Sequence, residues 1–145
     1  MAAAPQNLSN HARYVPGYHF LLSVLLLAVL GWQIYFLAIR PSVGTGLGLV
    51  LAVALILMYW YMRLFAVTVQ DRVIRLEERL RMAALLPPEL QSRIDEFTVE
   101  QLVALRFASD RELPDLARRV LEERIADRQQ IKGMIREWRG DYLRA

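Results

Sequence analysis

Cysteine is absent from the sequence, which excludes disulfide bridges, thiolate metal sites and cysteine nucleophiles. Acidic residues are absent from the first 70 positions, where the only Lys or Arg residues are Arg13, Arg40 and Arg63. Residues 71–145 contain all 15 acidic residues and the other 15 basic ones. The net charge of +3 therefore belongs entirely to the first half, and the chain divides into an apolar part and a charged part.

The composition of the charged half disfavours nucleic-acid binding and enzymatic catalysis. Its acidic and basic residues are interleaved in equal numbers, whereas nucleic-acid binding requires Lys and Arg gathered on one face. It contains no histidine, and the patterns GxxxxGK, GxSxG and HExxH are missing from the sequence. We therefore expect no nucleic-acid partner, no metal site and no enzymatic activity.

The apolar half contains two uncharged runs of 22 residues, residues 18–39 and 41–62, framed by Arg40 and Arg63. A helix of 22 residues is about 33 Å long, enough to cross a hydrocarbon core of about 30 Å. The first run is too long for the apolar region of a cleaved signal peptide. We predict a tail over residues 1–17, a first transmembrane helix over 18–39, a short periplasmic loop over 40–46 and a second transmembrane helix that begins near 47.

The positive-inside rule predicts the orientation of these spans. The loop between them contains one arginine, whereas Arg13 precedes the first span and several arginines follow the second. Aromatic residues lie near the ends of both runs, as is typical of the headgroup region. We expect a protein of the bacterial inner (cytoplasmic) membrane with both termini in the cytoplasm and the lipid bilayer as its solvent.

The second span is predicted to continue as a cytoplasmic stalk to about residue 85, before Pro87-Pro88. Apolar residues recur there at helical spacing: Phe65, Val69, Val73, Leu76, Leu80 and Ala83. Asp71 with Arg75 and Glu77 with Arg81 have the spacing of helix-stabilising ion pairs.

Residues 86–145 are predicted to form a small helical bundle. Thr98-Val-Glu-Gln101 and Ser109-Asp-Arg-Glu112 resemble capping boxes, and Asp127 can open a last helix. A stripe of Ile131, Ile135, Trp138 and Tyr142 extends that helix to the end of the chain. The predicted fold is all-α. Because about 60 residues make a marginal core, we expect this unit to pack on the stalk, the membrane surface or a partner.

The candidate site residues lie mostly near the predicted membrane surface. His19 is the one residue that could bind a cofactor, through axial ligation of haem iron or of (bacterio)chlorophyll magnesium. A single histidine supplies only one axial ligand, so an interfacial structural role is the main expectation and no cofactor is predicted. The candidates for partner contacts are Asn10, His11, Arg13, Tyr18, Arg63, Asp71, Arg72, Arg75 and Trp138.

Four stretches resemble a family of small bacterial two-span membrane proteins that is catalogued as a domain of unknown function. They are NHARYVPGYHF, RLFAVTVQDRVIRLEERLR, LVALRFASD and IREWRGDYLRA, and the resemblance extends over essentially the whole chain. It implies a fold but no activity. The residues that it assigns to family motifs are Asn10, His11, Arg13, Pro16, Tyr18 and His19; Arg63, Gln70, Asp71, Arg72, Arg75 and Glu78; and Arg106, Phe107, Ala108, Ser109 and Asp110.

These motifs lead to a docking hypothesis and to three candidate functions. We expect the N-terminal tail, the stalk around Asp71 and residues 107–110 to meet. The main functional expectation is a non-catalytic accessory subunit that stabilises a larger integral-membrane complex, such as a photosynthetic or respiratory one, through contacts with other membrane subunits. The alternatives are a self-associating scaffold or stress protein of the envelope, which uses the stalk stripe as a coiled-coil seam, and a pigment- or haem-contacting subunit.

Overall fold

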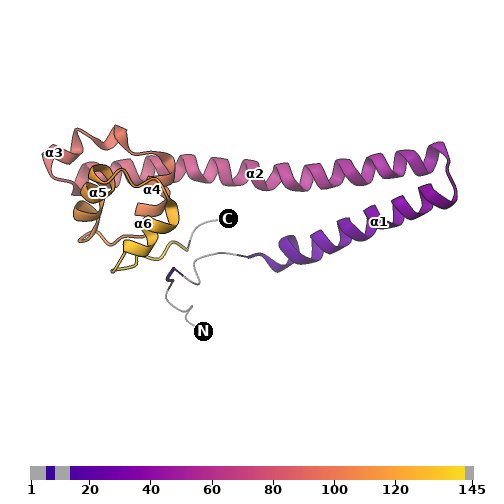
Figure 1. Cartoon of the computed structure of the whole chain (residues 1–145), viewed down its shortest axis with the longest axis horizontal. Coiled ribbons are helices and arrows are strands. Elements are labelled where there is room, and N and C mark those ends of the chain that lie inside the picture. Colours follow the sequence, from indigo (N-terminus) through magenta and orange to yellow (C-terminus); the bar gives the residue numbers. More distant parts are fainter. Residues whose placement is uncertain (1–5, 9–13, 143–145) are drawn as a thin grey trace. The chain divides into compact units, whose positions relative to one another are not determined.

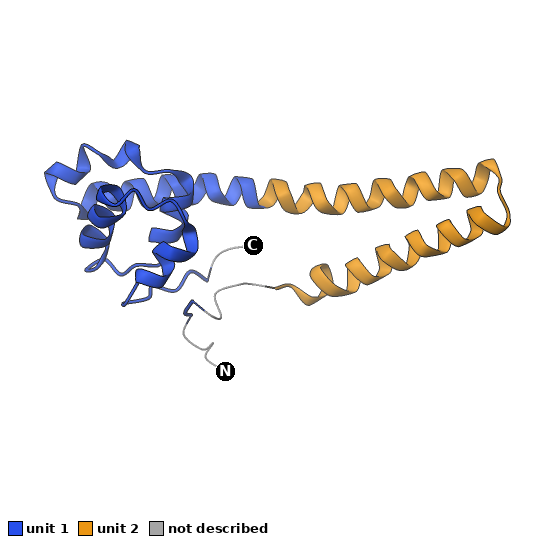
Figure 2. Cartoon of the chain, viewed as in Figure 1, with its two compact units in different colours: residues 1–12, 67–145 blue, residues 13–66 orange. Residues whose placement is uncertain are grey.

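The computed structural model describes residues 6–8 and 14–142, and the described residues form helices joined by short connections, with no strand among them (Figure 1). The chain divides into two compact units (Figure 2). One comprises residues 13–66, and the other comprises residues 1–12 and 67–145. The helices are a π-helical turn over Gly17–Leu22, α1 over Ser23–Ile39, α2 over Val43–Leu85, α3 over Pro88–Gln91, a 3₁₀ turn over Ile94–Glu96, α4 over Val99–Leu105, α5 over Leu113–Glu122 and α6 over Arg128–Met134.

The unit of residues 13–66 contains a helical hairpin, α1 followed by the first part of α2. Only residues 40–42 connect the two helices, because α2 begins at Val43 and not near residue 47. Ser42 and Thr45 explain the early start. The Ser42 N–H donates to Thr45 Oγ1 at 2.9 Å, and the Thr45 N–H donates to Ser42 Oγ at 3.1 Å. This reciprocal cap satisfies two donors at the helix start, so the stretch PSVGTG is mostly helix.

Aromatic and polar contacts hold α1 against α2 within this hairpin. The Tyr18 hydroxyl donates to the Tyr59 carbonyl oxygen at 2.7 Å, and the two rings stack with centroids 4.6 Å apart. Ser23 Oγ lies 2.9 Å from the Tyr59 hydroxyl. Further along, the Gln33 amide lies against Gly48, where an added Cβ would meet Gln33 Oε1 at 2.6 Å. The small residue therefore lets a polar side chain of α1 approach the α2 backbone.

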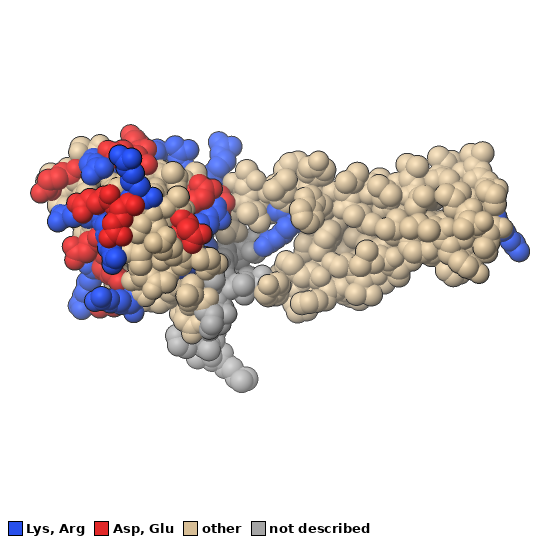
Figure 3. All heavy atoms as spheres, viewed as in Figure 1, with Lys and Arg blue, Asp and Glu red and all other residues tan. Residues whose placement is uncertain are grey.

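Both helices of the hairpin are long and apolar enough to cross a membrane: Gly17–Ile39, and α2 within Val43–Leu85. Their apolar side chains are outside, not inside, since α1 contains no buried residue and only 6% of the most apolar window of α2 is buried. Figure 3 shows this unit almost free of charged side chains, in contrast to the other. A helix that is apolar and exposed on most of its circumference fits a lipid environment, whereas the core helix of a soluble protein is covered by protein.

Helix α2 has 43 residues, which corresponds to a length of about 65 Å. It continues without interruption past Arg63, as the sequence predicted, and ends at Leu85. Pro87 follows with φ −65° and ψ 157°. A proline cannot donate a helical hydrogen bond, which explains the position of the helix end.

The second unit has its hydrophobic core between the last turns of α2 and the short helices that follow. Met82 of α2 and Leu86, which directly follows the helix, contribute to this core. Figure 1 shows α3 to α6 gathered beside this end of α2. The remaining core side chains come mainly from α4, α5 and α6, and include Leu102, Leu105, Leu113, Leu116, Val120 and Ile131. The short helices therefore complete a core that α2 begins.

Two of the three predicted helix starts are confirmed in full. Thr98 and Gln101 form the reciprocal box, with Gln101 N donating to Thr98 Oγ1 at 3.2 Å and Thr98 N donating to Gln101 Oε1 at 2.8 Å. Asp127 Oδ1 accepts from Gln130 N at 2.7 Å. At the third start, Glu112 N donates to Ser109 Oγ at 3.2 Å, but the Glu112 carboxylate turns elsewhere and leaves the box half formed.

The prediction that the last helix runs to Tyr142 is wrong. Helix α6 ends at Met134, and Ile135 has the extended values φ −72° and ψ 124°. The stripe of apolar residues has another cause, because Ile131 faces the core, whereas Trp138 pairs with Ala108 in an isolated β-bridge. Tertiary pairing prevails over helical periodicity in this segment.

Replacing Met82 tests the shared core. Its side chain is fully buried, so Met82→Ala should lower the free energy of unfolding of this unit by about 2–5 kcal/mol through lost packing and a cavity. Amide hydrogen exchange of α4 in the full chain in detergent measures the loss. Met82→Leu conserves volume and should cost less than about 1.5 kcal/mol. Equal effects of the two variants would contradict the assigned packing.

Candidate functional site

The segment after α4, residues 106–110, pairs with the segment after α6. The Ser109 N–H donates to the Glu137 carbonyl oxygen at 2.9 Å, and the Arg139 N–H donates to the Phe107 carbonyl oxygen at 2.7 Å. Between these bonds Ala108 and Trp138 form an antiparallel bridge. The stretches ALRFASD and IREWRGDYLRA, far apart in the sequence, are therefore joined through their backbones.

Glu112 fixes the direction of the C-terminal segment. Its carboxylate accepts the N–H of Arg136 at 2.9 and 3.1 Å and the N–H of Glu137 at 2.9 Å. Ser109 adds a hydrogen bond from its hydroxyl to Glu137 Oε2 at 2.8 Å. Charge-assisted bonds to consecutive backbone N–H groups are stronger than neutral ones. They hold the bend at Arg136 and Glu137, directly after α6, and explain why the helix stops.

Phe107 is the aromatic centre of this junction. It is fully buried, and its ring stacks on that of Trp138 with centroids 4.7 Å apart. The Arg106 guanidinium carbon lies 4.6 Å from the ring centroid, and Lys132 Nζ lies 5.2 Å from it. Both distances are within the range of cation–π attraction, which helps to compensate for the burial of two cationic side chains.

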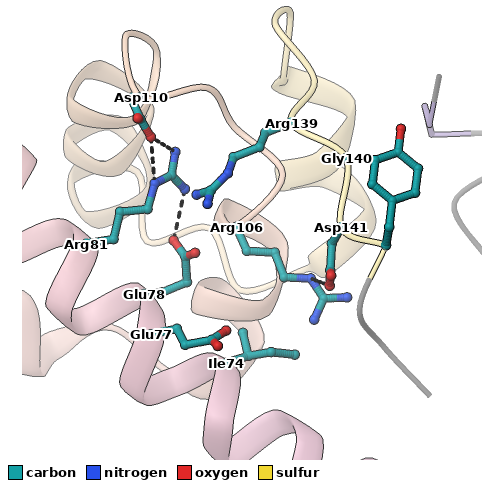
Figure 4. Close-up of a pocket in the computed structure, with 10 residues that line it drawn as sticks. Ile74, Glu77, Glu78, Arg81, Arg106, Asp110, Arg139, Gly140 and Asp141 are labelled. Carbon is teal, nitrogen blue, oxygen red and sulfur yellow. Dashed lines mark hydrogen bonds and ion pairs between the residues drawn. The ribbon is translucent and has the colours of Figure 1, made fainter.

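Arg81 fastens α2 to this junction. Its Nε donates to Asp110 Oδ1 at 2.9 Å and its Nη1 donates to Glu78 Oε2 at 3.1 Å (Figure 4). Its Nη2 donates to the Ala108 carbonyl oxygen at 2.7 Å. Nη2 also lies 2.7 Å from Asp110 Oδ1. The side chains of Arg81 and Glu78 are 10% and 7% exposed. The planar guanidinium thus serves three acceptors from two elements, which the point charge of a lysine cannot do in one plane.

A groove of about 690 Å³ lies beside this fastening and is the candidate site. Its floor is α2 and its wall is the segment from Arg139 to Tyr142, and Figure 4 shows the Arg139 side chain extending between Arg81 and Arg106. Its charged lining residues are Glu77, Glu78, Arg81, Arg106, Asp110, Arg139 and Asp141. Because four carboxylates face three guanidiniums, the groove is suited to polar protein contacts and not to a phosphate or another isolated anion.

Burial raises the pKa of Glu78 above its ordinary value of 4.5, and the neighbouring Arg81 opposes this by favouring the carboxylate. Glu78 lies fifteen residues past Arg63 on α2, outside the apolar run. Its ionised form is therefore less favourable in the folded chain than in the unfolded chain.

The N-terminal residues that the structure describes reach the same C-terminal segment. Gln6 Nε2 donates to the Asp141 carbonyl oxygen at 2.9 Å, and the Asp141 N–H donates to Gln6 Oε1 at 2.9 Å. The Asp141 carboxylate also lies 3.5 Å from Arg106 Nε. One side-chain amide thereby pairs with the backbone of a residue 135 positions away.

The candidates near the first span have local partners. Tyr18 bonds to Tyr59, as described above. His19 Nδ1 accepts from the Val15 N–H at 3.0 Å, and its ring meets the rings of Tyr14 and Tyr18 edge-on, with centroids 5.6 and 5.2 Å away. These contacts connect His19, within the π-helical turn, to the residues just before it, and cofactor contact at His19 stays a prediction. Arg63 lies half-buried on α2. Among the described residues, no group of three His, Asp or Glu side chains could hold a metal ion.

The other residues predicted to contact a partner differ in their surroundings. Trp138 belongs to the aromatic junction. Asp71 Oδ2 lies 3.6 Å from Arg128 Nη2 of α6, whereas Arg72 and Arg75 are exposed. Asn10, His11 and Arg13 lie outside the described residues.

The predicted contact between residues 107–110 and the stalk exists, but at a different residue of α2 from the one predicted. Residues 108–110 do meet α2, but mainly through Arg81 and not through Asp71. The predicted pairs of Asp71 with Arg75 and of Glu77 with Arg81 are replaced by the tertiary pairs of Asp71 with Arg128 and of Arg81 with Asp110.

The apolar stripe of α2 beyond Arg63 is the second feature of interest. Val69, Val73, Leu76 and Leu80, which we call the exposed stripe, are 60%, 49%, 61% and 65% exposed. At about 100° per residue they lie on the face of α2 opposite to the buried residues Ile74, Glu78 and Met82. The helical unit therefore packs on the other side of the stalk and leaves the stripe uncovered.

A family model described as a family of unknown function (DUF6526) matches residues 1–145. The chain belongs to the DUF6526 family. No curated protein and no solved structure matches this DUF6526 chain.

Sequence reasoning missed the most important residues of the DUF6526 helical unit. Arg81 was assigned to a surface ion pair, and Glu112 to a capping box. One signal for Arg81 was available, because it lies one turn before the apolar pair Leu85-Leu86 at the end of the predicted stalk, where a charge needs a partner.

Arg81→Gln should detach α2 from residues 108–110 in the DUF6526 chain. The change leaves Glu78 buried without its cation, and breaking one side of such a pair costs about 3–5 kcal/mol. Limited proteolysis of the full chain should then cut faster near Pro87-Pro88. Glu78→Gln in the same chain removes the orphaned charge and should restore part of the resistance. Equal cutting of the single variant and the wild type would show that Arg81 fastens nothing.

Glu78 also predicts a pH dependence of stability. Because its folded-state pKa lies above its ordinary value of 4.5, the folded state binds this proton more tightly than the unfolded state does. Its contribution is complete below the ordinary value and is lost as the pH rises through the folded pKa. Urea unfolding at a series of pH values should show Glu78→Gln gaining on the wild type as the pH rises. A difference that stays constant with pH would refute the assignment.

Proposed function

We propose that this chain is a non-catalytic accessory subunit of a larger integral-membrane complex, held in the membrane by its two apolar helices and assembled through the exposed stripe. The stripe is the observation that carries the proposal. Exposed apolar residues on the hairpin suit lipid, but Val73, Leu76 and Leu80 lie ten or more residues past Arg63. A patch of this kind outside lipid is typical of a protein interface.

The proposed topology has two spans and both termini in the cytoplasm of a bacterial cell, at the inner membrane. Two observations support it. The connection between the helices contains only Arg40, whereas Arg63, Arg72 and Arg75 follow the second apolar run. Gln6 and Asp141 are hydrogen-bonded to each other, which supports placing both ends of the chain on one side of the membrane.

The use of the polar residues in the helical unit supports a structural role. Its polar residues are used for fastening: Arg81 serves Glu78, Asp110 and Ala108, and Glu112 binds backbone N–H groups. Figure 3 shows acidic and basic side chains intermingled on its visible face. Such a surface is soluble next to a membrane and can present α2 in a fixed shape to a partner.

Affinity purification of the full chain in mild detergent, with quantitative mass spectrometry, tests this function. A stoichiometric integral-membrane protein should copurify with the wild type. Leu76→Arg places a charge in the interface and should reduce this recovery about ten-fold or more. Arg75→Ala, off the stripe on the same helix, serves as the control and should retain the partner. Recovery without any other membrane protein, or equal recovery with Leu76→Arg, would overturn the proposal.

A further inference from the structure

The exposed stripe has the spacing of a coiled-coil seam. From Ala66 to Ala83 apolar residues alternate at steps of three and four, the pattern that keeps one face of a helix toward a partner helix. The core a positions are Ala66, Val73 and Leu80, and the core d positions are Val69, Leu76 and Ala83. A β-branched residue at a followed by leucine at d, as at Val73 and Leu76, favours two parallel strands.

The flanking charges identify which helix fits. Arg72 occupies a g position and Glu77 the e position five residues later. In a parallel pair, g of one helix faces e of the next heptad on the other. Two copies of α2 would therefore form an Arg72–Glu77 pair on each side of the seam. Arg72 and Glu77 are both exposed, and neither forms an ion pair with another residue of ranges 6–8 and 14–142.

The remaining g position agrees with this assignment. Arg79 would face Ala84 of another copy, which offers no charge. Within the chain Arg79 is already occupied, since its Nη2 lies 2.8 Å from Asp95 Oδ1. Arg72, which has an acidic counterpart across the seam, thus forms no ion pair with another described residue of the chain. Arg79, which has no counterpart, pairs with Asp95 of the same chain.

Membrane insertion supplies the orientation that the seam requires. Copies with the same topology carry their stalks in the same direction, which permits a parallel pair and excludes an antiparallel one. Three a and three d positions over about 26 Å make a short coiled coil. Anchoring in the membrane raises the effective concentration of the two stalks and so favours a weak pairing.

We propose that the partner of the exposed stripe is a second copy of this chain, joined along Val69, Val73, Leu76 and Leu80 in a parallel two-stranded coiled coil with Arg72–Glu77 pairs across the seam. This inference deepens the proposed function, because it rests on the stripe being the interaction surface. It makes the accessory subunit enter its complex as a dimer, and it leaves the helical unit and its groove free on the opposite face of α2.

Cysteine crosslinking tests the seam, and the absence of native cysteine makes it specific. In membranes containing the full chain, Leu76→Cys should give a covalent homodimer on mild oxidation. Arg75→Cys, exposed on the same helix but at a c position, serves as the matched control and should not. Equal crosslinking at both positions would indicate random collision and overturn the proposal.

Charge exchange provides the second measurement, made in the Leu76→Cys background. Arg72→Glu and Glu77→Arg each place like charges across the seam, and each should reduce the crosslinked dimer about five-fold. The double variant Arg72→Glu/Glu77→Arg restores opposite charges and should restore the dimer. No restoration would overturn the assigned register.

The identity of the crosslinked product separates this inference from the proposed function. If Leu76→Cys crosslinks only to a different membrane protein, the second-copy proposal is overturned and the accessory function is supported. If it crosslinks only to itself and purification finds no other membrane protein, the dimer stands and the accessory function fails. Absence of the homodimer overturns the second-copy inference, and the accessory function is then decided by the purification alone.

Discussion

The structure of the helical unit depends on one buried guanidinium. Arg81 belongs to α2, yet two of its three acceptors, Asp110 and the Ala108 carbonyl, belong to the segment after α4. That segment in turn holds Glu137 and Arg139 by backbone hydrogen bonds. A chain of contacts thus runs from the long helix to the C-terminal segment. Each link is a directional hydrogen bond, so the short helices can pack on α2 in only one position. A purely apolar core of this size would permit several.

The two apolar helices, the length of α2 and two of the helix starts could be predicted because they depend on composition and on local signals. Two uncharged runs, the lack of a breaker before Pro87 and the caps at Thr98 and Asp127 were all readable from the residues. The end of α6 was not readable. Ile131, Ile135 and Trp138 keep helical spacing, but the carboxylate of Glu112, more than twenty positions earlier, binds the N–H groups of Arg136 and Glu137 after the helix end. Periodicity records which side chains are apolar and does not record what the backbone N–H groups bind.

At the candidate site, the partners of the charged residues could not be predicted from the sequence either. Neighbouring opposite charges on a helix suggest pairs such as Asp71 with Arg75, each worth a few tenths of a kcal/mol. In the folded chain Asp71 lies near Arg128 and Arg81 bonds to Asp110, because a partly buried pair between elements gains more than an exposed pair within one helix. The residues of the family motifs could be named from the sequence, but their partners could not be.

The pairing of Gln6 with Asp141 has a consequence for the order of events during synthesis. The first residues to leave the ribosome find their partner only when nearly the whole chain has been made. The hairpin can enter the bilayer and the short helices can close on α2 before this bond forms, since neither step involves Gln6. Contacts between such distant positions form late because closing the intervening loop costs entropy. Gln6 is therefore among the last residues to be secured, and a chain truncated before Asp141 would leave it without this partner.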